Sequence, residues 1–303
     1  MQHKAWPILK PGDAVEVIAP AGRVSEENLA KIVALLTHWK LQVKVADDIL
    51  GDDLLCANSD AARFQHLKQA LFNSSTKAII CARGGYGAMR LLPELFKLQR
   101  PPTPKLLLGM SDITALQIFL QQQWGWSTLH GSLAVWHLTE TSLAAVRQII
   151  FGEIKQLELT DLTPLNNGAK QTTVISSSIV GGNLCLVQCS LATPWQFKAE
   201  AKIILLEEIN ERAYKVDRML EQLYQANIFA NAKAIVFGDF MGGEEPNGAS
   251  LIMPVLRRFA ERISIPVLQI KGVGHGAINQ AIPLGTAVKL ITGVKSSLSC
   301  PLI

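Results

Sequence analysis

Ser111 stands where an apolar, strand-like run, residues 106–110 (LLLGM), gives way to a helix-like segment. A serine at such a step can be a nucleophile on a sharp turn, because the first N–H groups of the helix would stabilise a developing oxyanion. It can equally be an ordinary helix cap, since serine is a favoured N-cap residue. The segment is not a G-x-S-x-G pattern, because Ile113 stands where the last glycine would be.

A nucleophilic serine needs a base, and the base needs an acid that orients it. Of the six histidines, His275 lies in residues 272–276 (GVGHG), where the glycines leave its ring unshielded. His130 is the rival base, because it is nearer to Ser111 in sequence, and spacing alone does not choose between the two. Glu207 ends an apolar run and could hold an imidazole in the right tautomer, although a carboxylate at a strand end is more often solvated.

A glycine-rich segment, residues 83–87 (RGGYG), follows another apolar run. Glycines allow positive φ values and the close approach of backbone N–H groups to a ligand. Because ligands of open parallel sheets gather beyond the carboxyl ends of the strands, this segment and Ser111 could share one site. The segment could instead be a tight turn or a phosphate-binding loop, although it lacks the Lys-Ser/Thr of a P-loop.

The first half of the chain alternates strand-like and helix-like segments, which indicates a parallel sheet covered on both faces. The expected strands are residues 14–19, 41–45, 78–82 and 106–110, and the expected helices are residues 26–39, 59–72, 88–97 and 112–123. In the second half, strands are expected near 173–180, 202–207, 233–238, 267–270 and 286–292, and helices near 214–226 and 250–262. A length of 303 residues suggests two domains. We expect an N-terminal α/β domain (1–150), a polar linker (151–172) and a C-terminal domain (173–303).

Composition argues against several classes of protein. The net charge of +4 is spread thinly, without a basic stripe interleaved with aromatic residues, so nucleic-acid binding is not expected. No apolar run is long enough to span a membrane, and the start of the chain lacks the pattern of a secretory signal. The five cysteines lack zinc-ligand spacing, so reduced thiols in a cytoplasmic protein are expected.

Taken together and in order, these segments resemble the LD-carboxypeptidase family, serine peptidases whose best-known members are cytoplasmic murein tetrapeptide carboxypeptidases. The likeness runs over nearly the whole chain. It is carried by residues 10–13 (KPGD), 17–22 (VIAPAG), 83–87 (RGGYG), 109–116 (GMSDITAL), 130–131 (HG), 181–184 (GGNL), 206–208 (LEE), 217–220 (DRML), 274–276 (GHG) and 283–285 (PLG). The resemblance implies an α/β fold with a doubly wound parallel sheet domain, followed by a smaller, strand-rich C-terminal α/β domain.

The family's catalytic residues are a serine, a glutamate and a histidine, in that chain order. Carried over by motif, the resemblance implies Ser111 as the nucleophile, Glu207 as the orienting acid and His275 as the base. It therefore favours His275 over His130. The site would lie between the two domains and would need neither a metal nor a cofactor.

The resemblance also implies an oxyanion hole, with one N–H donor from Asp112 and the other from Gly85 or, as second choice, Gly84. A carboxypeptidase must also recognise a free carboxylate. Arg83 is a candidate for that role, although a structural salt bridge would equally explain an arginine there. The implied reaction cleaves the L,D-amide bond and releases terminal D-alanine from a murein tetrapeptide, in cytoplasmic cell-wall recycling, by a homodimer.

Two other functions stay open. A hydrolase of peptidyl- or aminoacyl-nucleotides from the same family, giving antibiotic immunity, would need an aromatic platform for a base. Trp195 or Trp124 could serve, but core packing explains both more simply, and no long insertion precedes Glu207. A non-catalytic protein could instead hold an anion or a peptide with the glycine-rich segment and the helix N-terminus. The presence of Ser111, Glu207 and His275 together argues against that function.

Overall fold

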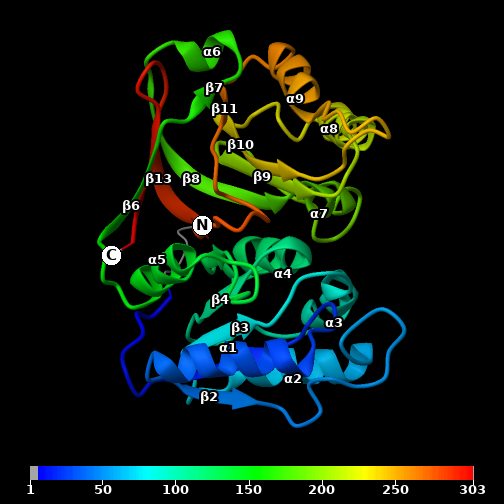
Figure 1. The fold of residues 1–303 in the computed structure, drawn as a ribbon, viewed down its shortest axis with the longest axis vertical. Coiled ribbons are helices and arrows are strands. Elements are labelled where there is room, and N and C mark those ends of the chain that lie inside the picture. Colours follow the sequence, from blue (N-terminus) through cyan, green and yellow to red (C-terminus); the bar gives the residue numbers. More distant parts are fainter. Residues whose placement is uncertain (1–5, 303) are drawn as a thin grey trace. The chain divides into compact units, whose positions relative to one another are not determined.

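The computed structural model describes residues 6–302, which divide into two compact units. The first unit runs to Glu153 and includes Ala281–Pro283, and the second contains Ile154–Gln280 and the chain from Leu284 onward. Both units are α/β, and each has its own sheet (Figure 1). Among the described residues, no helix is long and apolar enough to cross a membrane.

The sheet of the first unit has six strands in the order β12-β5-β4-β3-β1-β2. Their bounds are Ala14–Ile18 (β1), Gln42–Val45 (β2), Ala78–Cys81 (β3), Leu106–Gly109 (β4), Thr128–His130 (β5) and Ile282–Leu284 (β12). The pairs of β1 with β2 and β3, of β3 with β4, and of β4 with β5 are all parallel. Every residue of β3 and β4 is buried, as expected of parallel strands that are covered on both faces.

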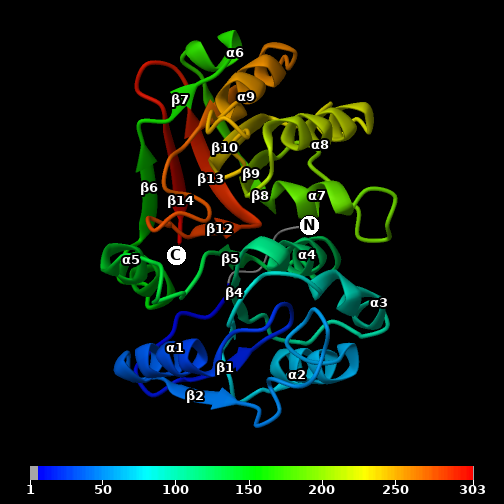
Figure 2. The ribbon, with the colours of Figure 1, turned by 45° about the vertical axis from the view of Figure 1, so that its right-hand side comes forward.

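The helices of this unit lie on both faces of its sheet. Figure 2 shows α1 (Glu26–His38) and α5 (Glu140–Ile150) on one side and α2 (Asp60–Phe72) and α3 (Leu92–Leu95) on the other. The chain runs in opposite directions from β1, to β2 on one side and to β3, β4 and β5 on the other, and crossovers between parallel strands are right-handed as a rule, which places the helices on opposite faces. The strand order thus reverses at β1 and β3, which is where ligands bind in such folds. The predicted doubly wound parallel sheet is confirmed.

The shorter helices of this unit are η1 (Ala88–Leu91), η2 (Ser111–Ile113), α4 (Thr114–Phe119) and η3 (Leu120–Trp124).

The sheet of the second unit has eight strands in the order β6-β14-β13-β8-β9-β10-β11-β7. Their bounds are Gln156–Thr160 (β6), Thr163–Pro164 (β7), Val174–Asn183 (β8), Ile203–Ile209 (β9), Ala234–Met241 (β10), Val267–Gln269 (β11), Thr286–Ile291 (β13) and Ser297–Pro301 (β14). The four strands from β8 to β11 pair in parallel, whereas the strands outside them pair antiparallel. The helices of this unit are α6 (Asn167–Lys170), α7 (Leu184–Cys189), α8 (Ala213–Gln225) and α9 (Ile252–Glu261).

Two segments differ from the domain boundaries expected from the sequence. Residues 151–172, expected to be a linker, contain β6, β7 and α6. In β6, Leu157 and Leu159 are buried while their neighbours are exposed, and an edge strand of this polarity resembles a linker in composition. Residues 281–283, expected in the C-terminal domain, belong to the first unit because β12 lies beside β5. At three residues, β12 is too short for a periodic pattern to reveal it.

Gly131 marks a close approach between the chain after β5 and the start of β12. A Cβ atom on Gly131 would lie 2.6 Å from the Ala281 Cβ atom and 3.3 Å from its Cα atom. We expect Gly131→Ala to lower the free energy of unfolding by about 1–3 kcal/mol, as overpacking usually does. Amide exchange in residues 281–284 should also become faster.

Ala281→Gly in the Gly131→Ala protein is the matched test, because it removes the nearer of the two atoms. The double variant is expected to regain most of the lost stability in urea denaturation. If Gly131→Ala were as stable as the wild type, β12 would not be packed as the structure has it.

Candidate active site

Ser111 lies at a strained turn directly after β4. The strand ends at Gly109, Met110 is extended, and Ser111 begins the short helix η2 that leads into α4. The φ angle of Ser111 is +61°, a left-handed conformation that costs roughly 1 kcal/mol or more for a residue with a side chain. The cap position of η2 is Met110 and not Ser111. A helix-capping role therefore does not account for this conformation, and such strain is typical of functional sites.

The glycine-rich loop after β3 packs directly against this turn. A Cβ atom on Gly84 would lie 2.8 Å from Ser111 Cβ and 2.9 Å from the carbonyl oxygen of Met110, so a side chain does not fit there. The loop after β1 joins them, because the N–H of Gly22 donates to the carbonyl of Gly84 at 2.9 Å. Gly85 has a φ angle of +102°, which glycine adopts freely. The carboxyl ends of β1, β3 and β4 therefore meet around Ser111.

The carboxylate of Asp112 ties the Ser111 turn to the far end of the glycine-rich loop. Asp112 is buried, and its Oδ2 accepts the N–H of Ala88 at 2.7 Å. Burial raises the pKa of Asp112 above that of an ordinary aspartate. The backbone N–H of Asp112 is among the first of the helical segment, and such groups have no partner within a helix. The residue can thus position the loop with its side chain and offer its N–H to a ligand.

Arg83, the predicted carboxylate-binding residue, lies at the surface of the first unit. Its Nη1 donates to the carbonyl of Arg23, in the loop after β1, at 2.6 Å. The side chain is exposed. This contact gives Arg83 a structural role in joining two loops, and its guanidinium stays accessible to an anion.

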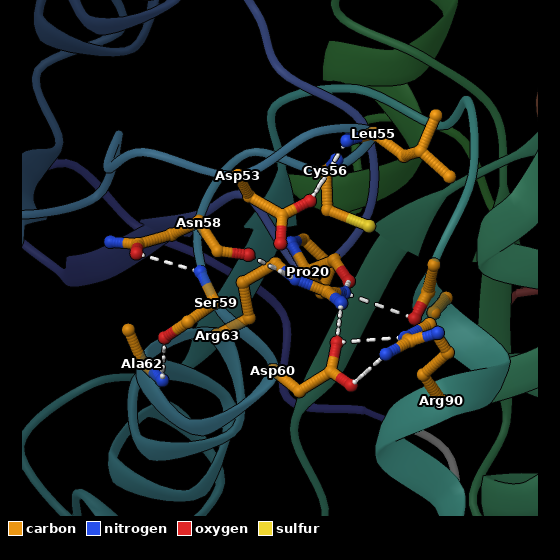
Figure 3. Close-up of polar contacts among 12 residues, drawn as sticks. Pro20, Asp53, Leu55, Cys56, Asn58, Ser59, Asp60, Ala62, Arg63 and Arg90 are labelled. Carbon is orange, nitrogen blue, oxygen red and sulfur yellow. Dashed lines mark hydrogen bonds and ion pairs between the residues drawn. The ribbon is translucent and has the colours of Figure 1, made fainter.

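Arg63, a buried arginine that is not among the predicted site residues, holds the bases of both loops (Figure 3). Its Nη1 donates to the carbonyls of Pro20 and Gly87, and its Nε donates to that of Asn58 at 2.9 Å. Asp60 forms an ion pair with it. The loop after β1 and the glycine-rich loop are therefore fixed to one side chain of α2. In the sequence, an arginine on the apolar face of a predicted helix could have indicated this buried role for Arg63.

In the second unit, a buried glutamate orients a histidine. Glu207, near the carboxyl end of β9, is 0% exposed, and its Oε2 lies 2.6 Å from Nδ1 of His275. The His275 side chain, in the loop after β11, is 15% exposed. Gly274 leaves room for the pair, since a Cβ atom there would lie 3.2 Å from Glu207 Oε2. Because Nδ1 faces the carboxylate, it carries the proton of the neutral ring, and Nε2 is left to accept another.

The pKa of His275 reflects two opposing effects. Burial lowers the pKa, because it disfavours the charged ring. The hydrogen bond to Glu207 and the negative charge of that carboxylate raise it and outweigh the burial, so the pKa lies above the ordinary value of 6.5. The ring therefore binds a proton more readily than a free histidine, as a general base must.

Glu208, the second carboxylate of this strand end, has different partners. Side chains alternate along a strand, so Glu208 points to the face opposite Glu207. Its Oε1 accepts Nδ2 of Asn183 at 2.9 Å, and its Oε2 accepts the N–H of Cys185 at 2.8 Å. Both partners lie at the start of α7. Between the two neighbouring glutamates, Glu207 is the one that contacts the histidine.

Two polar residues that the sequence prediction missed hold the histidine loop. Asp239, in β10, accepts the N–H of Gly272 through Oδ2 at 3.0 Å, and its own N–H donates to the carbonyl of Val273 at 2.7 Å. Asn279 donates from Nδ2 to the carbonyl of Gly274. The available signal for Asp239 was a carboxylate directly after the apolar run 234–238 (AIVFG).

Three aromatic residues that the sequence left open as alternatives are buried. His130 is 1% exposed, and its Nδ1 lies 3.2 Å from Oε1 of Gln117 in α4. Trp124 and Trp195 are buried too, and Trp124 packs edge-on against Trp126. Their burial leaves little ring surface for stacking against a ligand.

Comparison with known proteins gives matches over most of the chain. Residues 15–131 match a family model described as the LD-carboxypeptidase N-terminal domain, and residues 176–290 match the LD-carboxypeptidase C-terminal domain. A "Putative carboxypeptidase" of Rickettsia prowazekii is 40% identical, over 91% of this chain and 87% of its own. The "Probable murein peptide carboxypeptidase" of Bacillus subtilis is 30% identical, over 96% and 92%. The "Murein tetrapeptide carboxypeptidase" of Pseudomonas aeruginosa is 27% identical, over 90% and 92%.

Solved structures share the fold. The muramoyltetrapeptide carboxypeptidase from Oxalobacter formigenes superposes with a TM-score of 0.79 at 24% identity, over 95% of this chain and 98% of that one. An MccF-like protein from Bacillus anthracis superposes with a TM-score of 0.83 at 23% identity, over 98% and 99%. At these identities the likeness concerns the fold alone.

Gly84→Ala is expected to displace the Ser111 turn, because the new Cβ atom meets a backbone carbonyl that cannot rotate away. The free energy of unfolding should fall by about 1–3 kcal/mol in urea denaturation. Gly168→Ala is the matched control, because a Cβ atom there meets its nearest neighbour at an ordinary 3.4 Å. Equal stability of Gly84→Ala and the wild type would contradict the close approach of the two loops.

The pKa of His275, followed by NMR of its ring protons, is expected above 6.5 in the wild type. Glu207→Gln removes the negative charge and leaves the burial, so the pKa should fall below 6.5. Glu208→Gln leaves the contact between His275 and Glu207 in place, so it should lower the pKa of His275 by less. An unchanged pKa in Glu207→Gln would rule out the ion pair.

The free energy of unfolding, measured by urea denaturation at a series of pH values, should depend on the protonation of His275. A raised histidine pKa means that the folded protein holds the proton more tightly than the unfolded chain. The pair therefore stabilises the fold fully below pH 6.5, and this contribution is lost as the pH rises through the folded-state pKa of His275.

Proposed function

The chain belongs to the LD-carboxypeptidase family of hydrolases, and we propose that it is a serine L,D-carboxypeptidase that releases terminal D-alanine from murein tetrapeptides. The observation that carries the proposal is the φ angle of +61° at Ser111, on a turn between strand and helix. The 2.6 Å contact between Glu207 and His275 supports it, because a serine nucleophile needs an oriented base. The names of the relatives from Bacillus subtilis and Pseudomonas aeruginosa support the substrate class.

In the proposed mechanism, Nε2 of His275 takes the hydroxyl proton of Ser111 while Nδ1 stays bonded to Glu207. The serine Oγ attacks the carbonyl carbon of the L,D-amide bond, and the N–H groups of Asp112 and Gly85 stabilise the tetrahedral oxyanion. His275 passes the proton to the nitrogen of the departing D-alanine. Water, deprotonated by the same histidine, then hydrolyses the acyl-enzyme and restores Ser111.

Arg83 is the proposed contact for the free carboxylate of the substrate, because it is the first residue of the glycine-rich loop and its side chain is exposed. Gly84 is proposed to line the site, since its missing side chain leaves space next to Ser111. The family resemblance also supports a proposed cytoplasmic role in cell-wall recycling and a homodimer. Light scattering on the purified protein measures the oligomeric state.

The wild type is expected to remove one D-alanine from a meso-diaminopimelate murein tetrapeptide, which mass spectrometry detects as the tripeptide. Ser111→Ala should slow the reaction by at least about 10³-fold, as expected when a nucleophile is removed. Ser132→Ala is the matched control, because its hydroxyl accepts the N–H of Ala134 within a loop, and it should keep full activity. Cleavage by Ser111→Ala at the wild-type rate would remove Ser111 from the mechanism.

The fold is also shared with MccF in complex with glutamyl sulfamoyl guanosine (TM-score 0.82, 16% identity), which makes an aminoacyl-nucleotide the second substrate to test. The burial of Trp124 and Trp195 argues against either one as a platform for a base. Cleavage of the nucleotide conjugate without cleavage of the tetrapeptide would replace the proposed substrate. A folded protein that cleaves neither but binds the murein peptide equally well as wild type and as Ser111→Ala would indicate a non-catalytic binding protein.

A further inference from the structure

A cavity of about 660 Å³ lies in the second unit, at the carboxyl ends of the neighbouring strands β10 and β11 (Figure 1). Its walls come from the end of β10, the start of α9 and the loop that carries His275. The apolar part of the wall consists of Phe240, Met241, Ile252, Met253, Ala277 and Ile278. Small-molecule sites in proteins usually have volumes of about 300–1,000 Å³ and a mostly apolar lining. The cavity therefore has the size and the lining of a binding site.

The cavity begins directly beside the proposed catalytic histidine. Gly276 lines the cavity and follows His275 in the chain, so the Cα atoms of the two residues are about 3.8 Å apart. In the proposed mechanism, the ring of His275 contacts the nitrogen of the scissile amide. The substrate residue on the amino side of that amide contributes the carbonyl carbon, and its side chain starts close to that atom. A long side chain at this substrate residue can therefore extend from the scissile bond into the cavity.

Two residues of opposite charge, Asp239 and Lys271, line the cavity together with the apolar side chains. Asp239 is half-buried, and its Oδ2 accepts the N–H of Gly272 at 3.0 Å, which leaves the carboxylate free to accept further hydrogen bonds. Burial raises the pKa of Asp239, and the nearby charge of Lys271 opposes this effect. Lys271 itself is exposed. A carboxylate and an ammonium in one cavity are complementary to a ligand group that carries both charges, such as the free end of an amino acid.

We propose that this cavity binds the side chain of the substrate residue whose carbonyl Ser111 attacks, and that Asp239 and Lys271 bind an ammonium and a carboxylate at the end of that side chain. The proposal rests on the proposed peptidase activity. In an uncross-linked murein tetrapeptide, the side chain of meso-diaminopimelate is a short chain of methylene groups that ends in a free amino-acid centre. The methylene groups suit the apolar wall, and the two charges suit Lys271 and Asp239. A lysine at the same place lacks the carboxylate, so the cavity selects diaminopimelate over lysine.

Two tetrapeptides that differ only in this residue, meso-diaminopimelate or L-lysine, test the selection. The wild type should cleave the diaminopimelate peptide with a kcat/KM about 10–100-fold higher, the factor expected from one hydrogen bond to a charged group. Lys271→Gln should lower kcat/KM for the diaminopimelate peptide by this factor and leave that for the lysine peptide unchanged. Lys289→Gln is the matched control, because Lys289 is an exposed lysine of β13, which three strands separate from β11. A preference for diaminopimelate that survives in Lys271→Gln would overturn the proposal.

A binding measurement separates this proposal from the proposed activity. The probe is the tripeptide that ends in meso-diaminopimelate, added to protein with labelled methionine methyl groups and followed by NMR. The methyl signals of Met241 and Met253, which line the cavity, should shift, whereas that of Met219 in α8 should not. Lys271→Gln should need about 10–100-fold more tripeptide for the same shift.

The two measurements fail in different ways. Shifts at Met241 and Met253 that depend on Lys271, in a protein that cleaves neither tetrapeptide, would support the cavity as a binding site and remove the peptidase activity. Cleavage of the diaminopimelate peptide without any shift at these methyl groups would support the peptidase activity and overturn the cavity as the binding site.

Discussion

A carboxylate withdrawn wholly from water costs several kcal/mol unless it is paired and hydrogen-bonded. Glu207 is such a group, and the second unit is arranged around the need to pair it with His275. The parallel strands deliver Glu207 to the carboxyl end of the sheet. Gly274 must then lack a side chain, and Asp239 and Asn279 must hold the loop that brings the imidazole back to it. The orientation of the histidine is thus a consequence of where the buried charge lies.

The first unit satisfies a steric constraint rather than an electrostatic one. Three loops pack against one another in sequence: the loop after β1 contacts Gly84, and Gly84 contacts Ser111 in the turn after β4. They can do so because Gly22 and Gly84 have no side chains to separate them. Arg63 donates hydrogen bonds to the carbonyl groups of Gly87 and Asn58, and so joins these turns through one buried side chain. The strained φ angle of Ser111 persists because these neighbours leave the turn no other conformation.

Patterns within short stretches of sequence predicted most strands and helices of the first unit, but not contacts between distant residues. Alternating apolar runs located β1, β3 and β4, and helical spacing located α1 and α2. The apolar run and the resemblance both pointed to Glu207, although two carboxylates, Glu207 and Glu208, end that run. Arg63 escaped prediction because its partners, Pro20 and Gly87, lie 43 and 24 residues away in sequence. β12 escaped because its place in the sheet depends on a strand more than 150 residues earlier.

The return of the chain to the first sheet at β12 matters during synthesis. A ribosome releases β1 to β5 long before it reaches residue 282. Until then, the edge of β5 is open to any other strand, which is how nascent chains aggregate. The first unit therefore completes its folding only after residues 154–280 of the second unit have been made. A gene fragment that stops at Glu153 would encode a sheet whose edge is never closed.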